Sequence, residues 1–170
     1  MIRRSPRPGA GRILAALVVL GIAIAVPLRL RAAKGRVAVL VNKSNVVSGL
    51  SSAELRRILL GEETRWDGKE KITILLLPTG SDERKILLKI LLKMSDDDFT
   101  RHWISRVFQG QSTAAPKKAA SAASMLKLVA GLPTALGIVD LDDVPPGDTG
   151  LKVLSVDGKA PNEDGYSLTR

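Results

Sequence analysis

The stretch whose residue types best suit ligand binding follows a fully apolar run and contains Thr79, Gly80, Ser81 and Arg84. The glycine and the proline before it favour a turn, and Ser81 is of the type preferred at the N-terminal cap of a helix. A helix N-terminus carries unpaired backbone N–H groups and a partial positive charge, so it attracts anions. Arg84, one turn further on, would add a fork of donors to a phosphate, sulfate or carboxylate. We therefore predict a small-anion site at this turn.

A second interpretation stays open, in which the same stretch is an ordinary turn and helix cap without a ligand. Asp82 and Glu83 fall in the first turn of the expected helix, where they would repel an anion about 4 to 6 Å away. We therefore expect bare phosphate to bind at about millimolar affinity or more weakly. Ser112 and Thr113, in a later loop rich in small and polar residues, are candidates for further hydroxyl donors.

The other chemically active residue types form no catalytic or metal-binding pattern. The sole histidine, His102, has no partner visible in the sequence, and a lone histidine is more often structural than catalytic. The acids at 96–98 follow Ser95 and are expected to complement a helix dipole, and those between 140 and 143 lack the spacing of a ligand loop. No nucleophile elbow and no Cys/His pair occurs. We predict a protein that is not an enzyme and needs no cofactor or metal.

Positive charge is concentrated at the start of the chain. The 170 residues include 26 basic and 17 acidic ones, but residues 1–36 contain eight of the basic residues and no acid. The remainder therefore has 18 basic residues against 17 acidic ones. Because the basic excess belongs to this leader and only 3% of residues are aromatic, we expect no binding of nucleic acid.

The leader has the pattern of an export signal. Four arginines precede an uncharged apolar run at 13–28, as in the basic and hydrophobic regions of a secretory signal. An Ala-x-Ala cleavage site at 23–25 and an uncleaved membrane anchor both remain open. We assign residues 1–34 to a signal peptide or N-terminal membrane anchor. The protein is then expected in the periplasm, or anchored to the inner membrane and facing the periplasm.

Residues 35–170 are expected to form one domain in which strands and helices alternate, an α/β layer architecture. Apolar runs without a polar face predict strands that are covered on both sides, at 37–41 and 71–77. Two further strands are predicted at 135–139 and 151–156. Helices are predicted after Ser51, Ser81 and Ser95 and at 120–130. Ser51 and Glu54 have the spacing of a capping box.

Two tryptophans are expected to play different parts. Trp103 recurs at helical spacing with Phe99 and Val107, joined on that face by Ile104 and Phe108. We expect Trp103 in the core. Trp66 is expected in a loop, where its ring either covers the edge of the sheet or contacts a partner.

Several stretches, in order and spacing, resemble the phosphate-binding periplasmic proteins of ABC uptake systems, which have the type 2 solute-binding fold. They are residues 39–61, Thr64-Arg65-Trp66, Gly80-Ser81-Asp82-Glu83-Arg84, residues 133–139, and residues 153–161 with 165–170. The third stretch occupies the place of the family's Gly-Ser-Gly-Thr-Arg anion-binding turn. Asp82 and Glu83 replace the family's glycine and threonine there, and the chain matches only the second of the family's two lobes.

The resemblance implies a single three-layer lobe of a type 2 periplasmic-binding-protein-like fold, with a mostly parallel sheet and helices on both faces. It also implies an exported solute-binding protein that takes phosphate or another small anion and works with an ABC transporter or another envelope protein. The alternative is a protein-interaction module that kept this fold and lost the ligand.

Overall fold

The computed structural model describes residues 35–111 and 115–169. The chain divides into two units, Met1–Ala32 and Ala33–Arg170, and all described elements belong to the second. The predicted signal peptide or anchor at 1–34 therefore lies outside the described residues. Within them, no helix is both long enough and apolar enough to cross a membrane.

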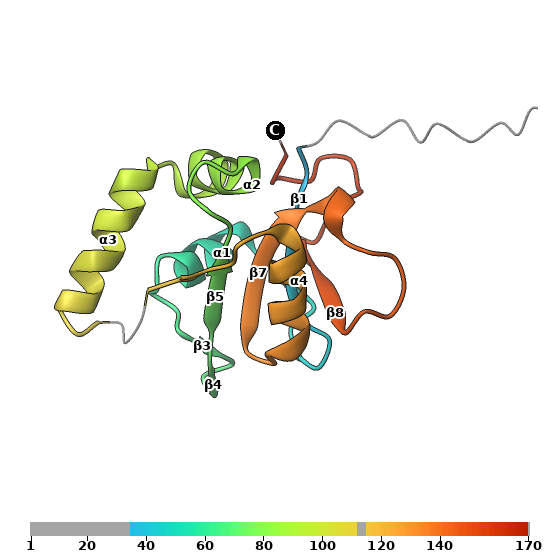
Figure 1. Ribbon diagram of the computed structural model, residues 1–170, viewed down its shortest axis with the longest axis horizontal. Coiled ribbons are helices and arrows are strands. Elements are labelled where there is room, and N and C mark those ends of the chain that lie inside the picture. Colours follow the sequence, from blue (N-terminus) through green and yellow to red (C-terminus); the bar gives the residue numbers. More distant parts are fainter. Residues whose placement is uncertain (1–34, 112–114, 170) are drawn as a thin grey trace, which may run out of the picture. The chain divides into compact units, whose positions relative to one another are not determined.

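A six-stranded sheet with the strand order β2-β8-β1-β7-β5-β6 forms the middle layer of the domain (Figure 1). Its strands are β1 (Val37–Asn42), β2 (Gly49–Leu50), β5 (Thr73–Leu76), β6 (Lys117–Lys118), β7 (Ala135–Asp140) and β8 (Leu151–Val156). β1 pairs antiparallel with β7 and β8, whereas β2 with β8, β5 with β7 and β5 with β6 pair in parallel. Of these six strands, five run in one direction and β1 opposes them, which confirms the predicted mostly parallel sheet.

The burial of β1 explains why this sheet needs a layer of helices on each side. The apolar residues of β1 are fully buried. Val37, Val39 and Val41 belong to one apolar core, and Ala38 and Leu40 belong to another. This division follows from the geometry of a strand, in which successive side chains point to opposite faces of the sheet. A strand with no polar face must be covered on both sides, as predicted for this segment.

More helices cover one face of the sheet than the other. The first core receives side chains from α1 (Ser52–Leu59), α2 (Asp82–Ile86), its π-helical continuation η1 (Leu87–Leu92) and α3 (Asp96–Phe108). The second core is closed by α4 (Ala122–Gly131), and a 3-10 turn η2 (Leu141–Asp143) follows β7. The lobe therefore has the three predicted layers.

Three serines begin helices at the predicted positions. Ser51, Ser81 and Ser95 each accept a hydrogen bond from the backbone N–H three residues later, at 3.2, 3.3 and 3.1 Å. At α1, the Glu54 carboxylate accepts in return from the N–H of Ser51 at 2.8 Å. This reciprocal pair is the predicted capping box.

The helix after Ser81 is less regular than the sequence suggests. It is α-helical only to Ile86, continues as a π-helix, and ends at Lys93 in the left-handed conformation with φ 54°. The i→i+5 spacing of a π-helix brings Leu87 and Leu92 onto the same side, and both are buried in the first core.

Trp66 does not lie in a loop as predicted. It belongs to β3 (Arg65–Trp66), which pairs with β4 (Glu70–Lys71) in a separate two-stranded sheet. Its side chain is buried in the first core, and its indole N–H donates to the carbonyl of Thr134 at 3.0 Å. Its main role is therefore in packing rather than in contact with a partner.

Candidate ligand-binding site

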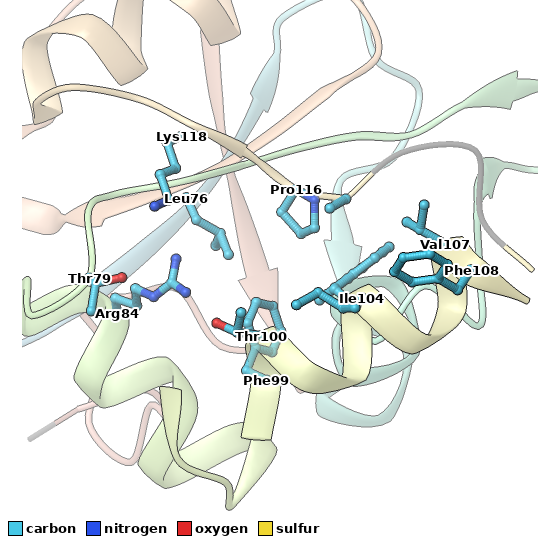
Figure 2. A pocket seen from close by; sticks show the side chains of 12 residues that line it. Leu76, Thr79, Arg84, Phe99, Thr100, Ile104, Val107, Phe108, Pro116 and Lys118 are labelled. Atoms are coloured by element: carbon cyan, nitrogen blue, oxygen red, sulfur yellow. The ribbon is translucent and has the colours of Figure 1, made fainter. Parts of the chain in front are cut away.

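A cavity of about 350 Å³ lies at the carboxyl ends of β5 and β6, whose last residues, Leu76 and Lys118, form part of its wall. The opposite wall is one side of α3 (Figure 2). Ligands of α/β sheets commonly bind outside the carboxyl ends of parallel strands, in cavities of about 300 to 1,000 Å³. The lining residues are Leu76, Thr79, Arg84, Phe99, Thr100, Trp103, Ile104, Val107, Phe108, Ala115, Pro116 and Lys118.

The polar lining gathers at one end of the cavity. Figure 2 shows the guanidinium of Arg84 between the hydroxyl groups of Thr79 and Thr100, with Lys118 above it in this view. Among the described residues, the lining therefore includes two cationic side chains and no carboxylate. This end of the cavity can receive an anion.

Arg84 is the most constrained of these groups. Only 7% of its surface is exposed, and its Nε–H donates to both carboxylate oxygens of Asp96 at 3.1 and 2.9 Å. Its NH2 group also donates to Asp96, at 2.5 Å, and the guanidinium lies 5.5 Å from the ring centre of Phe99. Asp96 therefore uses the side-on edge of the guanidinium in a bidentate pair.

The other edge of Arg84 is less occupied. A guanidinium has five N–H donors, of which Asp96 uses one on Nε and one on NH2. NH1 makes one long contact of 3.5 Å with the carbonyl of Leu77. Two of the five N–H groups, one on NH1 and one on NH2, consequently have no partner among the described residues.

The residues predicted for the anion site have different positions in the structure. Thr79 and Arg84 line the cavity. Gly80, with φ +88°, shapes the turn, and Ser81 uses its hydroxyl to cap α2, so the cap interpretation accounts for both. Ser112 and Thr113 lie outside the described residues. All of these stay predictions as ligand contacts.

The two acids expected to repel an anion do not line the cavity. Asp82 forms an exposed ion pair with Lys85 at 3.3 Å. Asp82 and Glu83 would therefore repel an anion at the turn more than one in the cavity, and the carboxylate nearest to Arg84 is that of Asp96.

One side of α3 caps the C-terminus of α1. The last carbonyls of a helix have no intrahelical donor, and at α1 they are met by side chains of α3. His102 Nε2 contacts the carbonyl of Leu60 at 2.8 Å, and Trp103 Nε1 donates to that of Leu59 at 3.1 Å. Arg106 donates to the carbonyl of Gly61 at 2.8 Å. His102 thus has a structural contact.

A second side of α3 lines the cavity. Phe99 and Trp103 are buried, as expected for Trp103. By contrast, Ile104, Val107 and Phe108 are 51%, 41% and 87% exposed. The five residues predicted to share one face of α3 therefore differ in burial. The side of α3 that packs against α1 is buried, whereas the neighbouring stripe of Ile104, Val107 and Phe108 lines the cavity and is exposed.

Thr100, Lys118 and the pair between Arg84 and Asp96 belong to this site and were not predicted from the sequence. Thr100 shares a helical stripe with Ile104 and Phe108, and that periodicity was available as a signal. The pair between Arg84 and Asp96 joins two helices across a turn, and no local spacing indicates it. Among the residues that the structure describes, no group of three or more potential metal ligands occurs.

No family model and no curated protein sequence matches the chain. Solved structures do match. An ABC-type phosphate transport receptor from Vibrio cholerae has 21% identity and a TM-score of 0.63 over 80% of this chain and 54% of its own. PstS from Borrelia burgdorferi has 16% identity and a TM-score of 0.63, over 81% and 55% of the two chains. The fold is the one these receptors use.

A third match is a putative phosphate ABC transporter substrate-binding protein with bound phosphate from Clostridium perfringens. It has 19% identity and a TM-score of 0.58, over 74% of this chain and 46% of its own. The chain thus spans about half the length of these proteins. At such identities the matches establish the fold, and they confirm the predicted resemblance at that level.

Proposed function

We propose that this chain is a non-enzymatic solute-binding protein that holds a small anion in the cavity at the carboxyl ends of β5 and β6. One observation carries the proposal. Arg84 is 7% exposed and lines the cavity, and two of its N–H groups have no partner among the described residues. A buried guanidinium with spare donors suits an anion, because hydrogen bonds to a charged donor are strong and burial limits screening by salt.

The neighbouring side chains would complete the site. The hydroxyls of Thr79 and Thr100 would donate to the anion, and the ammonium group of Lys118 would add charge across the cavity. The match to a receptor whose structure contains bound phosphate supports an anionic ligand of this kind.

The same proposal includes export and a partner. The basic and apolar pattern of residues 1–34 supports a location in the periplasm, or at the inner membrane facing it. The similarity to ABC transport receptors supports a role in ABC-linked uptake.

Calorimetric titration of the full chain, kept in solution with detergent, tests the ligand. We expect heat of binding with phosphate, sulfate or acetate, at about millimolar affinity for phosphate. Lys118→Gln should weaken that binding several-fold. Lys117→Gln is the matched control, because Lys117 is its neighbour in β6 and does not line the cavity. Absence of heat with every anion, or equal loss in both variants, would refute the proposal.

A second candidate function is a protein-interaction module. The observation that favours it is the exposure of Phe108, 87%, at the rim of the cavity. A photoreactive residue at position 108 should then cross-link to an envelope protein. One at position 46 should not, although Val46 is also an exposed apolar residue.

A further inference from the structure

The cavity has two chemically different ends, and a bare inorganic anion would use only one of them. Arg84, Thr79, Thr100 and Lys118 provide the polar end. The remaining lining is apolar, and much of it comes from α3. A phosphate or sulfate bound at Arg84 would leave that apolar wall in contact with water.

The apolar wall is built by one stripe of α3. Thr100, Ile104, Val107 and Phe108 follow the i, i+4, i+7, i+8 spacing of a single helical face. Seven large apolar side chains are exposed among the described residues, and three of them, Ile104, Val107 and Phe108, are in this stripe. Exposed apolar side chains gathered in one place mark a binding surface more often than isolated ones do. In Figure 2 the stripe continues from Thr100, beside Arg84, to Phe108 at the far end of the cavity.

The open edge of Arg84 suits a planar anion. Asp96 already shows the fit of a carboxylate to the side-on edge of this guanidinium. The two unpartnered N–H groups, on NH1 and NH2, can donate to one further carboxylate, whose two oxygens match the spacing of the fork. Thr100 stands where the polar end meets the apolar stripe, so its hydroxyl can donate to the same group.

We infer that the cavity takes a monocarboxylate with an apolar chain or ring, such as a short-chain fatty acid or an aromatic acid. Its carboxylate pairs with Arg84, and its apolar part lies against Ile104, Val107 and Phe108. This inference rests on the proposed anion site and adds the class of ligand.

A homologous series of acids tests the inference. Acetate, butyrate, hexanoate and benzoate are titrated into the full chain in detergent, with protein-free detergent as the blank. Burying a methylene group strengthens binding by about three- to fourfold. We expect hexanoate to bind at least tenfold more tightly than acetate, and hexanamide, which has the same chain without the charge, to bind at least tenfold more weakly than hexanoate.

Variants at exposed positions locate the apolar part of the ligand. Ile104→Ser and Phe108→Ser should weaken hexanoate several-fold and leave acetate unchanged, since acetate reaches only the polar end. Val46→Ser removes an apolar side chain that is 78% exposed and lies outside the cavity, and it should leave both affinities unchanged. Thermal melts of all three variants verify that each is folded.

Each contrary result has a separate meaning. Equal affinity for acetate and hexanoate, or for hexanoate and hexanamide, would overturn the inference. Phosphate binding that hexanoate does not displace would overturn it too, while leaving the proposed anion site intact. Absence of binding by every anion would overturn the site and the inference together.

Discussion

At the scale of single residues, the pair between Arg84 and Asp96 decides what the cavity can bind. The carboxylate makes hydrogen bonds at 2.5, 2.9 and 3.1 Å to a guanidinium that is almost fully buried. Asp96→Asn keeps the shape and removes the negative charge. We expect the free energy of unfolding to fall by about 1.5 to 3 kcal/mol, the usual value of hydrogen bonds to a charged group. Urea unfolding followed by circular dichroism measures it.

The same substitution has a second expected effect, on ligand affinity. With Asp96 neutral, the full charge of Arg84 is available to an anion, so phosphate should bind more tightly than in the native protein. Asp97→Asn removes an exposed acid from the same helical turn and should change stability by less than about 1 kcal/mol. Equal effects of the two substitutions would contradict the assigned pair.

The acids Asp82 and Glu83 have a smaller expected role than the sequence implied. Neither lines the cavity, so restoring glycine and threonine at these positions should change phosphate affinity less than Asp96→Asn does. Phosphate is titrated into the double variant Asp82→Gly with Glu83→Thr and, separately, into Asp96→Asn. The larger gain in affinity shows whether the acids of the turn or the carboxylate of Asp96 weaken phosphate binding.

At the scale of elements, the contact between α1 and α3 depends on the absence of a side chain at Gly61. Its φ is +72°, and a Cβ there would lie 2.6 Å from the ring of Trp103. Gly68 has nearly the same φ, +71°, with nothing within 4 Å. Gly61→Ala should therefore destabilise the protein by about 2 kcal/mol more than Gly68→Ala, because both incur the backbone strain but only the first overpacks a ring. Thermal melts that shift equally would rule out the close approach as the cause.

The start of α1 is also tied to the end of β8 by a titratable group. Asp157 accepts hydrogen bonds from the hydroxyl and the N–H of Ser52, and these bonds lower the pKa of its carboxyl below the ordinary value of 3.8. Stability from a lowered pKa is present above 3.8 and is lost as the pH falls through the folded-state value. Asp157→Asn should therefore lower the melting temperature near neutral pH, and the difference from the native protein should shrink below pH 3.8. Asp164→Asn removes an exposed acid and is the control, and its melting temperature near neutral pH should be close to that of the native protein.

Local patterns in the sequence predict some of these elements, whereas contacts between distant segments leave no such pattern. Strands β1 and β5 were predictable because apolar runs without alternation can only be covered on both sides. The helix starts were predictable because Ser51, Ser81 and Ser95 satisfy local backbone donors. The two-residue strands β2, β3, β4 and β6 were not predicted, since such short segments have no periodic pattern. The unequal burial along α3 was not predictable in the same way. It depends on the position of the C-terminus of α1, whose carbonyl groups contact side chains of α3. A contact between segments so far apart in the sequence leaves no periodic pattern. Thr79 and Arg84 could be proposed as site residues because they belong to one local pattern of turn and helix start. Asp96 could not, because it reaches Arg84 from another helix.

At the scale of the whole molecule, the cavity lies at the edge of the six-stranded sheet, beside the last strand β6. The chain spans about half the length of the receptors whose fold it uses. The side of the cavity that carries Ile104 and Phe108 is supplied by α3. The exposure of this wall, 51% at Ile104 and 87% at Phe108, is consistent with the modest affinity expected for a small anion.

The proposed export through residues 1–34 can be tested in cells. Residues 13–28 form an uncharged apolar run between basic flanks. Arginine at the centre of such a segment costs about 2.5 to 3.5 kcal/mol per residue on membrane insertion. Leu17→Arg with Leu20→Arg should therefore retain the protein in the cytoplasm, as measured by cell fractionation. Leu17→Ile with Leu20→Ile keeps the hydrophobicity and should be exported normally. Export of the arginine variant at the native level would mean that the leader is not what carries this protein across the membrane.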